Sequence, residues 1–112
     1  MALQLRLTES TAEVSAAHAL AWHHVSLAMD KAGREEPFTA LDRASAQRDA
    51  AFAARLTVRA VNRLFEASGA HAIADSDPLQ RFHRDIHTGS HHATLNWDVA
   101  AQQYGRLALG GS

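Results

Sequence analysis

The chain has 112 residues, a formal net charge of −1, 46% hydrophobic residues and 6% aromatic ones. This length suits one domain with a single modest core, and the dispersed arginines exclude a phosphate-binding stripe, so we expect no nucleic-acid partner. The lack of cysteine excludes disulfides, thiolate metal sites and a cysteine nucleophile, and no apolar run is long enough to span a membrane, so we expect a cytoplasmic protein.

Periodic apolar residues predict a first long helix that starts at about Leu5, or at the capping-box pattern Ser10 to Glu13, and reaches about Lys31. Gly33 ends it, and a polar turn to Pro37 follows. Its predicted inward stripe combines apolar residues with one histidine: Val14, His18, Ala21, Val25 and Ala28, flanked by Trp22 and Met29.

A second long helix is predicted from Pro37 or Thr39 to Ser68, with Gly69 after it. Apolar residues recur on it at three- and four-residue steps and predict a seam with another helix: Leu41, Ala44, Ala51, Ala54, Val58, Val61 and Phe65. Further apolar residues lie on its other side: Phe52, Leu56 and Leu64. This helix therefore needs apolar partners on two sides.

A third helix is predicted from Asp77, a good N-cap followed by proline, to about Leu95. A short fourth helix, capped near Asn96, is expected to be anchored by burial of Trp97. No segment predicts a strand. The expected fold is an all-α antiparallel bundle that forms one domain over residues 1–112.

The third helix is unusually rich in imidazole. His83, His87 and His91 recur at four-residue steps and share a face, which permits a zinc or nickel site. Spacing alone is a weak signal, so we expect a solvated or interface histidine ladder and no metal site. Few structural helices need so many histidines, which indicates that this helix faces a site.

The order of motifs resembles the C-terminal helical domain of the acyl-CoA dehydrogenase superfamily. A glycine-containing loop, Ser68 to Ile73, precedes a helix that carries Arg84-Asp85. The dehydrogenases then show Tyr-Glu-Gly-Thr, whose glutamate removes a proton from an acyl thioester. Here the corresponding residues, 92–95, read His-Ala-Thr-Leu, so the carboxylate is missing.

A histidine at the position of His92 is similar to the flavin-dependent aromatic hydroxylase branch, the oxygenase components that a separate reductase supplies with reduced flavin. The resemblance implies oxygen activation by reduced FMN or FAD and transfer of one oxygen atom to a phenol-like ring. It implies that His92 is catalytic, since an imidazole titrates near neutrality and can accept the phenol proton or hydrogen-bond the reacting oxygen. By the same analogy, Arg84 contacts the flavin.

The resemblance covers only part of such an enzyme. It implies that one long helix of the bundle, the N-terminal helical domain and the middle β domain lie outside these 112 residues. The chain alone is therefore expected to be inactive, and to self-associate or bind a companion chain that carries the flavin domains. Two other interpretations remain open: a fragment of an acyl-CoA dehydrogenase whose base lies elsewhere, and a non-catalytic assembly bundle.

Overall fold

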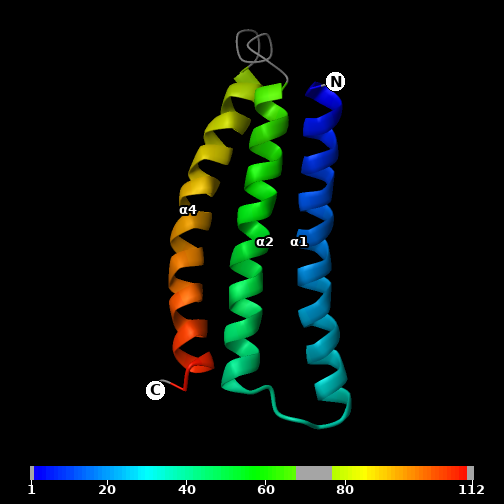
Figure 1. The fold of residues 1–112 in the computed structure, drawn as a ribbon, viewed down its shortest axis with the longest axis vertical. Helices are drawn as coiled ribbons and strands as arrows, with labels where there is room; N and C mark the ends of the chain where they lie inside the picture. Colours follow the sequence, from blue (N-terminus) through cyan, green and yellow to red (C-terminus); the bar gives the residue numbers. More distant parts are fainter. Residues whose placement is uncertain (1, 68–76, 111–112) are drawn as a thin grey trace.

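The computed structural model describes residues 2–67 and 77–110, and within that part it contains three helices and no strand. These are α1 (Ala2–Gly33), α2 (Ala40–Ala67) and α4 (Asp77–Ala108). They form an elongated antiparallel bundle of 54 × 26 × 25 Å in which α2 lies between α1 and α4 (Figure 1). The predicted all-α bundle is confirmed.

The predicted third and fourth helices are one continuous helix, α4. The expected N-cap at Asn96 is wrong, because this residue lies in the helix interior with its side chain exposed. The segment from His91 to Asn96 lacks proline and glycine, so nothing in its backbone chemistry ends a helix there. Trp97, predicted to anchor the fourth helix by burial, is half-buried within α4 and packs against Phe52 of α2 with ring centroids 5.4 Å apart.

α1 begins at Ala2, and the predicted capping box at Ser10 to Glu13 is wrong. Both side chains face α2 instead: the Ser10 hydroxyl donates to the carbonyl of Ala60, and Glu13 pairs with Arg63. A true capping box starts α2, where the Thr39 amide donates to Asp42 Oδ2 over 2.9 Å and the Asp42 amide donates to Thr39 Oγ1 over 3.0 Å. Of the two predicted starts of this helix, Pro37 and Thr39, the structure supports Thr39.

The core consists mainly of alanine, which lets the helices approach closely. Its buried apolar members are Ala17, Ala44, Ala51, Leu56, Ala60, Phe65, Ala93 and Ala100. The predicted seam of α2 is right in part, since Ala44, Ala51 and Phe65 are buried, whereas Leu41 and Ala54 are exposed and Val58 and Val61 are half-buried. The expected need for partners on both sides of α2 is met by α1 and α4.

The predicted inward stripe of α1 faces outward. Val14, Trp22, Val25 and Met29 are between 46% and 67% exposed, and His18 is exposed as well. The side of α1 that packs on α2 carries Ser10, Glu13 and Ala17 instead. Apolar residues usually face the core, so the stripe predicts a contact with α2, but the observed contact combines small apolar residues with polar ones.

The turn after α1 is closed by a non-glycine residue in the left-handed region. Gly33 ends the helix as predicted, but the residue with positive φ, 55°, is Glu35. The Glu36 amide donates to the Lys31 carbonyl over 2.8 Å, and the Glu35 amide donates to that of Ala32 over 3.2 Å. These two bonds form a Schellman motif whose left-handed position favours glycine.

Replacing Glu35 with glycine should therefore stabilise the chain by about 1 kcal/mol, because glycine adopts positive φ without the steric penalty of a Cβ atom. Urea denaturation followed by circular dichroism measures this change. Gly33→Ala is the matched comparison: Gly33 is helical and no atom lies within 4 Å of an added Cβ, so alanine should stabilise there too. Destabilisation by Glu35→Gly would contradict the assigned turn.

None of the described helices is long and apolar enough to cross a membrane.

Candidate functional site

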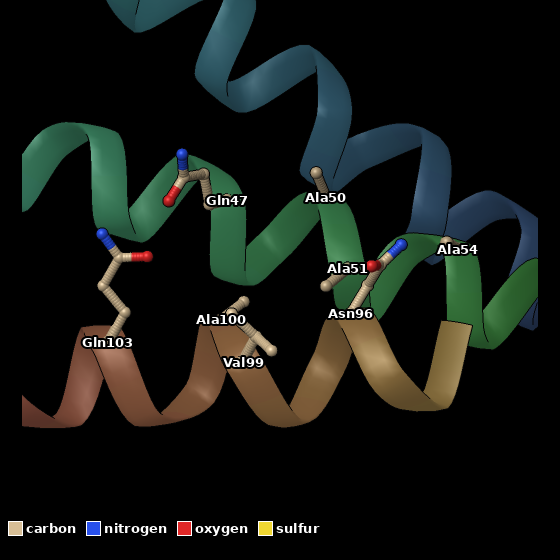
Figure 2. A pocket seen from close by; sticks show the side chains of 8 residues that line it. All are labelled: Gln47, Ala50, Ala51, Ala54, Asn96, Val99, Ala100 and Gln103. Carbon is tan, nitrogen blue, oxygen red and sulfur yellow. The ribbon is translucent and has the colours of Figure 1, made fainter. Parts of the chain in front are cut away.

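The groove between α2 and α4 is the candidate site, because helical spacing places His92 on the same face of α4 as residues that line it. The groove has a volume of about 440 Å³ and is lined by small and amide side chains from both helices (Figure 2): Gln47, Ala50, Ala51 and Ala54 from α2, and Asn96, Val99, Ala100 and Gln103 from α4. None of these side chains carries a charge. The groove therefore suits an uncharged group or helix surface.

His92 belongs to the face of α4 that borders this groove. Asn96, Val99 and Gln103 follow it at four, seven and eleven residues, the steps that keep residues on one helix face. The His92 side chain is exposed, and its ring lies 6.3 Å from that of His91. The imidazole is thus available to a group that covers the α2–α4 groove.

The residues beside His92 hold α4 against α2. Ala93, the residue after His92, is only 4% exposed. One turn before it, Gly89 lies where an added Cβ would be 3.7 Å from Cγ2 of Val58. The Thr94 hydroxyl donates to the Ser90 carbonyl over 3.0 Å. Packing on α2 therefore fixes this part of α4 and leaves His92 on its open side.

Arg84, the second residue singled out in the sequence, is also exposed on α4. Eight residues separate it from His92, which on an α-helix is roughly 12 Å along the axis and roughly 80° around it. The fold therefore does not bring the two side chains together. A single ligand that touches both would have to extend along more than two turns of α4.

The histidine ladder lies on another side of α4. His87 and His91 are exposed, and the side chain of His83 falls outside the described residues, as does the predicted stop at Gly69. Within the described part of the chain, no group of three or more histidine or carboxylate side chains is arranged to hold a metal ion.

A second groove of about 360 Å³ lies between α1 and α2. It is lined by Ser10, Thr11, Val14, Ser15, His18 and Leu64. His18, which the sequence placed on the inward stripe of the first helix, is exposed on this groove. The hydroxyls of Ser10 and Thr11 already donate to backbone carbonyls, so they are occupied by the fold.

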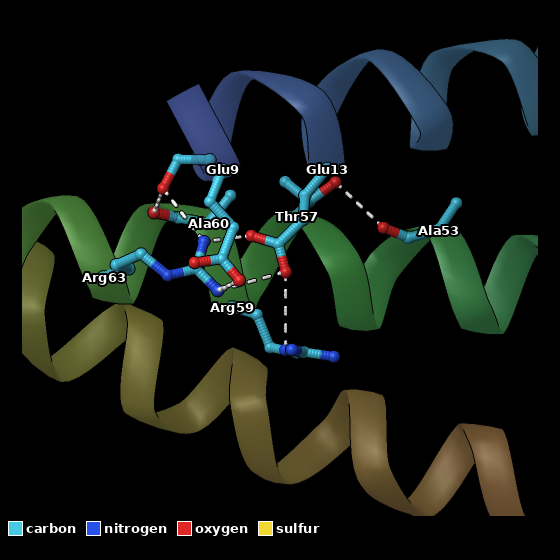
Figure 3. A network of polar contacts seen from close by, with 8 residues as sticks. Glu9, Glu13, Ala53, Thr57, Arg59, Ala60 and Arg63 are labelled. Atoms are coloured by element: carbon cyan, nitrogen blue, oxygen red, sulfur yellow. Dashed lines mark hydrogen bonds and ion pairs between the residues drawn. The ribbon is translucent and has the colours of Figure 1, made fainter. Parts of the chain in front are cut away.

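An extensive polar network between two helices was not predicted from the sequence. It joins α1 to α2 around Arg63 (Figure 3), which donates to Ser10 Oγ over 3.1 Å, pairs with both oxygens of Glu13 and lies 3.5 Å from Glu9. Arg59 adds a contact of 3.5 Å to Glu13. The hydrogen bond from Arg63 lowers the pKa of Glu13, and the positive charges of Arg63 and Arg59 act in the same direction, against the effect of burial. Glu13 is therefore held ionised.

Two further polar layers join α1 to α2 along the bundle. Lys31 pairs with Asp42, and this hydrogen bond, with those from Thr39, lowers the pKa of Asp42 to about 2.

The second of these layers lies around Asp49. His24 Nε2 lies 2.5 Å from Asp49 Oδ2, and Arg48 donates to the same carboxylate over 2.8 and 3.1 Å. Burial raises the pKa of Asp49, but the hydrogen bonds from Arg48 and His24 outweigh it and the net shift is downward.

The spacing of these partners was visible in the sequence. Asp42, Asp49, Leu56 and Arg63 follow one another at seven-residue steps on α2, and Ser10, Ala17, His24 and Lys31 do so on α1. A seven-residue repeat marks one seam of a helix pair whatever the residue type. The signal was missed because only apolar residues were counted.

The fold and this groove define an all-α bundle domain with an open, uncharged groove between α2 and α4. The profile of the family "Acyl-CoA dehydrogenase, C-terminal domain" matches residues 1–97, and the chain belongs to this family.

Among its relatives, the flavin-dependent monooxygenase oxygenase subunit HsaA of Mycobacterium tuberculosis is 37% identical over 96% of this chain and 27% of its own length. The oxygenase component of p-hydroxyphenylacetate 3-hydroxylase of Acinetobacter baumannii is 32% identical over 95% of this chain and 25% of its own length. The crystal structure of the M. tuberculosis HsaA monooxygenase superimposes with a TM-score of 0.84 at 31% identity, covering 98% of this chain and 29% of that one. The chain thus spans about a quarter of the length of the curated relatives it matches.

Proposed function

We propose that this chain is the C-terminal bundle portion, over residues 1–112, of a monooxygenase that uses reduced flavin to hydroxylate a phenol-like aromatic substrate. The observation that carries the proposal is the similarity, over almost the whole chain, to oxygenase components of flavin-dependent hydroxylases. One of them, from Rhizobium, is named an FADH(2)-dependent resorcinol hydroxylase. A flavin reductase is the partner that such an oxygenase component needs.

The residues of this chain suit one wall of a flavin site. The described part of the chain offers an exposed imidazole at His92 and an open, uncharged groove on the same face of α4. Neither of the two grooves described above is an enclosed cavity. Reduced flavin, when bound, supplies the electrons that activate oxygen. In this proposal His92 accepts the phenol proton or hydrogen-bonds the reacting oxygen, and Arg84 contacts the flavin two turns away along α4.

The burial of Ala93 favours hydroxylation over dehydrogenation. An acyl-CoA dehydrogenase needs a base aimed at the acyl chain, and at the corresponding position this chain has a methyl group enclosed at the α2–α4 contact. The complete enzyme should therefore consume reduced flavin and oxygen to hydroxylate a phenol, and should not reduce flavin with an acyl thioester. Flavin reduction by acyl-CoA would instead support the dehydrogenase interpretation.

The uncovered apolar surface supports a second role in assembly. The outer stripe of α1, formed by Val14, Trp22, Val25 and Met29, presents large apolar side chains to solvent. Val99, which is 66% exposed beside the α2–α4 groove, does so as well. Such surface is normally covered by a partner. We propose that it is buried by self-association or by a companion chain that carries the flavin domains.

The isolated chain should bind flavin weakly, because it supplies only one wall of the proposed site. Isothermal titration with reduced and oxidised FMN and FAD, compared with the same titration of the complete oxygenase, measures this difference. Analytical ultracentrifugation of the same samples reports self-association. Tight flavin binding by the isolated 112-residue chain would contradict the proposed division of the site.

A further inference from the structure

α1 is attached to α2 through its polar side. Three of its side chains that face α2 carry or can carry charge, namely Glu13, His24 and Lys31, and each pairs with a charged residue of α2. Large apolar side chains lie on other sides of α1 and are at least 46% exposed: Leu3, Leu5, Leu7, Val14, Trp22, Val25 and Met29. Because the hydrophobic effect scales with the apolar area removed from water, it contributes less to this contact than the length of α1 suggests.

The contact between α2 and α4 is built differently. Small apolar residues of the two helices meet there, with Ala44 and Ala51 buried on α2 and Ala93 and Ala100 buried on α4. Aromatic contacts reinforce it: the Phe52 and Trp97 rings pack together, and the Arg48 guanidinium lies 4.3 Å from the centre of the Tyr104 ring. This contact contains no carboxylate pair between helices among the ion pairs described.

Three carboxylates hold α1 in place, and the charged groups that face them come from both helices. Glu13 faces Arg59 and Arg63 of α2, with Glu9 on the far side of Arg63. Asp42 faces Lys31 of α1. Asp49 faces His24 of α1 and Arg48 of α2, and Tyr104 of α4 lies beyond Arg48.

Acid weakens all three of these contacts. The pKa of each carboxyl is lower in the folded chain than its ordinary value. A group of this kind stabilises the fold above its unfolded pKa, and the stabilisation is lost as the pH falls toward its folded pKa. The affected window therefore begins near pH 5 and extends downward, reaching about 2 for Asp42.

His24 reaches Asp49 through one ring nitrogen. Its Nε2 atom lies 2.5 Å from Asp49 Oδ2, whereas its Nδ1 atom is buried and has no hydrogen-bond partner among the described residues. The ring of His23 lies against it, with the two ring centroids 4.9 Å apart. The attachment of α1 at this layer therefore depends on the Asp49 carboxylate.

We propose that α1 is an acid-releasable helix: protonation of Glu13, Asp42 and Asp49 detaches it from α2, while α2 and α4 stay packed. The release exposes the polar side of α1 and the facing side of α2. This device depends only on contacts within the chain and is independent of the proposed oxygenase function.

Amide hydrogen exchange, read by mass spectrometry in peptides from α1 and α4 of the full chain, tests the proposal. Between neutral pH and pH about 3, and after correction for intrinsic rates, exchange in α1 should accelerate by about tenfold or more, while α4 changes much less. The double variant Glu13→Gln with Asp49→Asn should reproduce the α1 effect at neutral pH. Glu66→Gln with Asp98→Asn, two exposed carboxyls, is the matched control and should change neither helix.

An apolar seam provides the converse test. Replacing Glu13 and Arg63 with leucine and methionine, and both His24 and Asp49 with leucine, removes two of the three carboxyls that acid would protonate, together with the partners of those carboxyls. Apolar replacements of buried ion pairs are often neutral or stabilising. In this variant α1 should stay protected in acid. Equal loss of protection in α1 and α4, in the parent chain or in the double variant, would overturn the proposal. So would acid release of α1 from the apolar-seam variant.

Discussion

Replacing Ala100 with aspartate should unfold most of the bundle. Ala100 is 7% exposed at the α2–α4 contact, among Ala51 and other small side chains of the groove. A carboxylate at this position is desolvated or forces the helices apart, at a cost of roughly 3 kcal/mol or more, a large part of the stability of a small domain. Thermal and urea unfolding followed by circular dichroism measure the loss.

Gln102→Asp is the matched control for this prediction, because it introduces the same residue on the same helix at an exposed position. It should cost no more than the helix propensity of aspartate, about 0.7 kcal/mol. If the Ala100 and Gln102 variants unfold alike, the α2–α4 contact is not placed as described.

Replacing His92 with alanine should strongly reduce hydroxylation by the complete oxygenase. General acid–base groups contribute on the order of a hundredfold or more to rate, and His92 is the exposed imidazole on the groove side of α4. Reduced flavin should still be consumed, but with more hydrogen peroxide released and less hydroxylated product formed. The measurement is the ratio of product to peroxide for each reduced flavin oxidised, together with flavin affinity, which should change little.

His91→Ala is the adjacent control. His91 is also exposed, but neighbouring residues on an α-helix point about 100° apart, so its ring does not border the groove. This variant should keep the ratio of product to peroxide near that of the parent enzyme. Unchanged coupling in the His92 variant would remove the case for its catalytic role.

The helices were predictable where local signals are strong. Thr39 and Asp42 form the cap that starts α2, and Gly33 is the last residue of α1. The continuity of α4 was not predictable in the same way, because an asparagine followed by an apolar periodic run has the pattern of a new N-cap as well as of an uninterrupted helix. Asn96 lies inside α4, where packing on α2 continues on both sides of it.

The orientation of α1 could not be read from apolar periodicity. Val14 and Val25 mark a real stripe, but it lies on the uncovered side of the helix. The contact of α1 with α2 depends on charged residues of α2 that complement those of α1. The apolar periodicity of one helix contains no information about such pairs between helices. For the candidate site, the sequence indicated His92 and the structure adds the groove beside it, whose alanine and amide lining has no sequence signature of its own.

The central position of α2 determines how the effects of substitutions on stability combine. α1 and α4 each pack on α2, on different sides of it (Figure 1). Free-energy effects of substitutions at sites that share no partner usually add, whereas those of contacting residues do not. The effects of substitutions on the outer stripe of α1 and near His92 on the free energy of unfolding should therefore add. Any energetic coupling between them passes through α2, at residues such as Arg48 and Asp49 that reach toward both neighbouring helices.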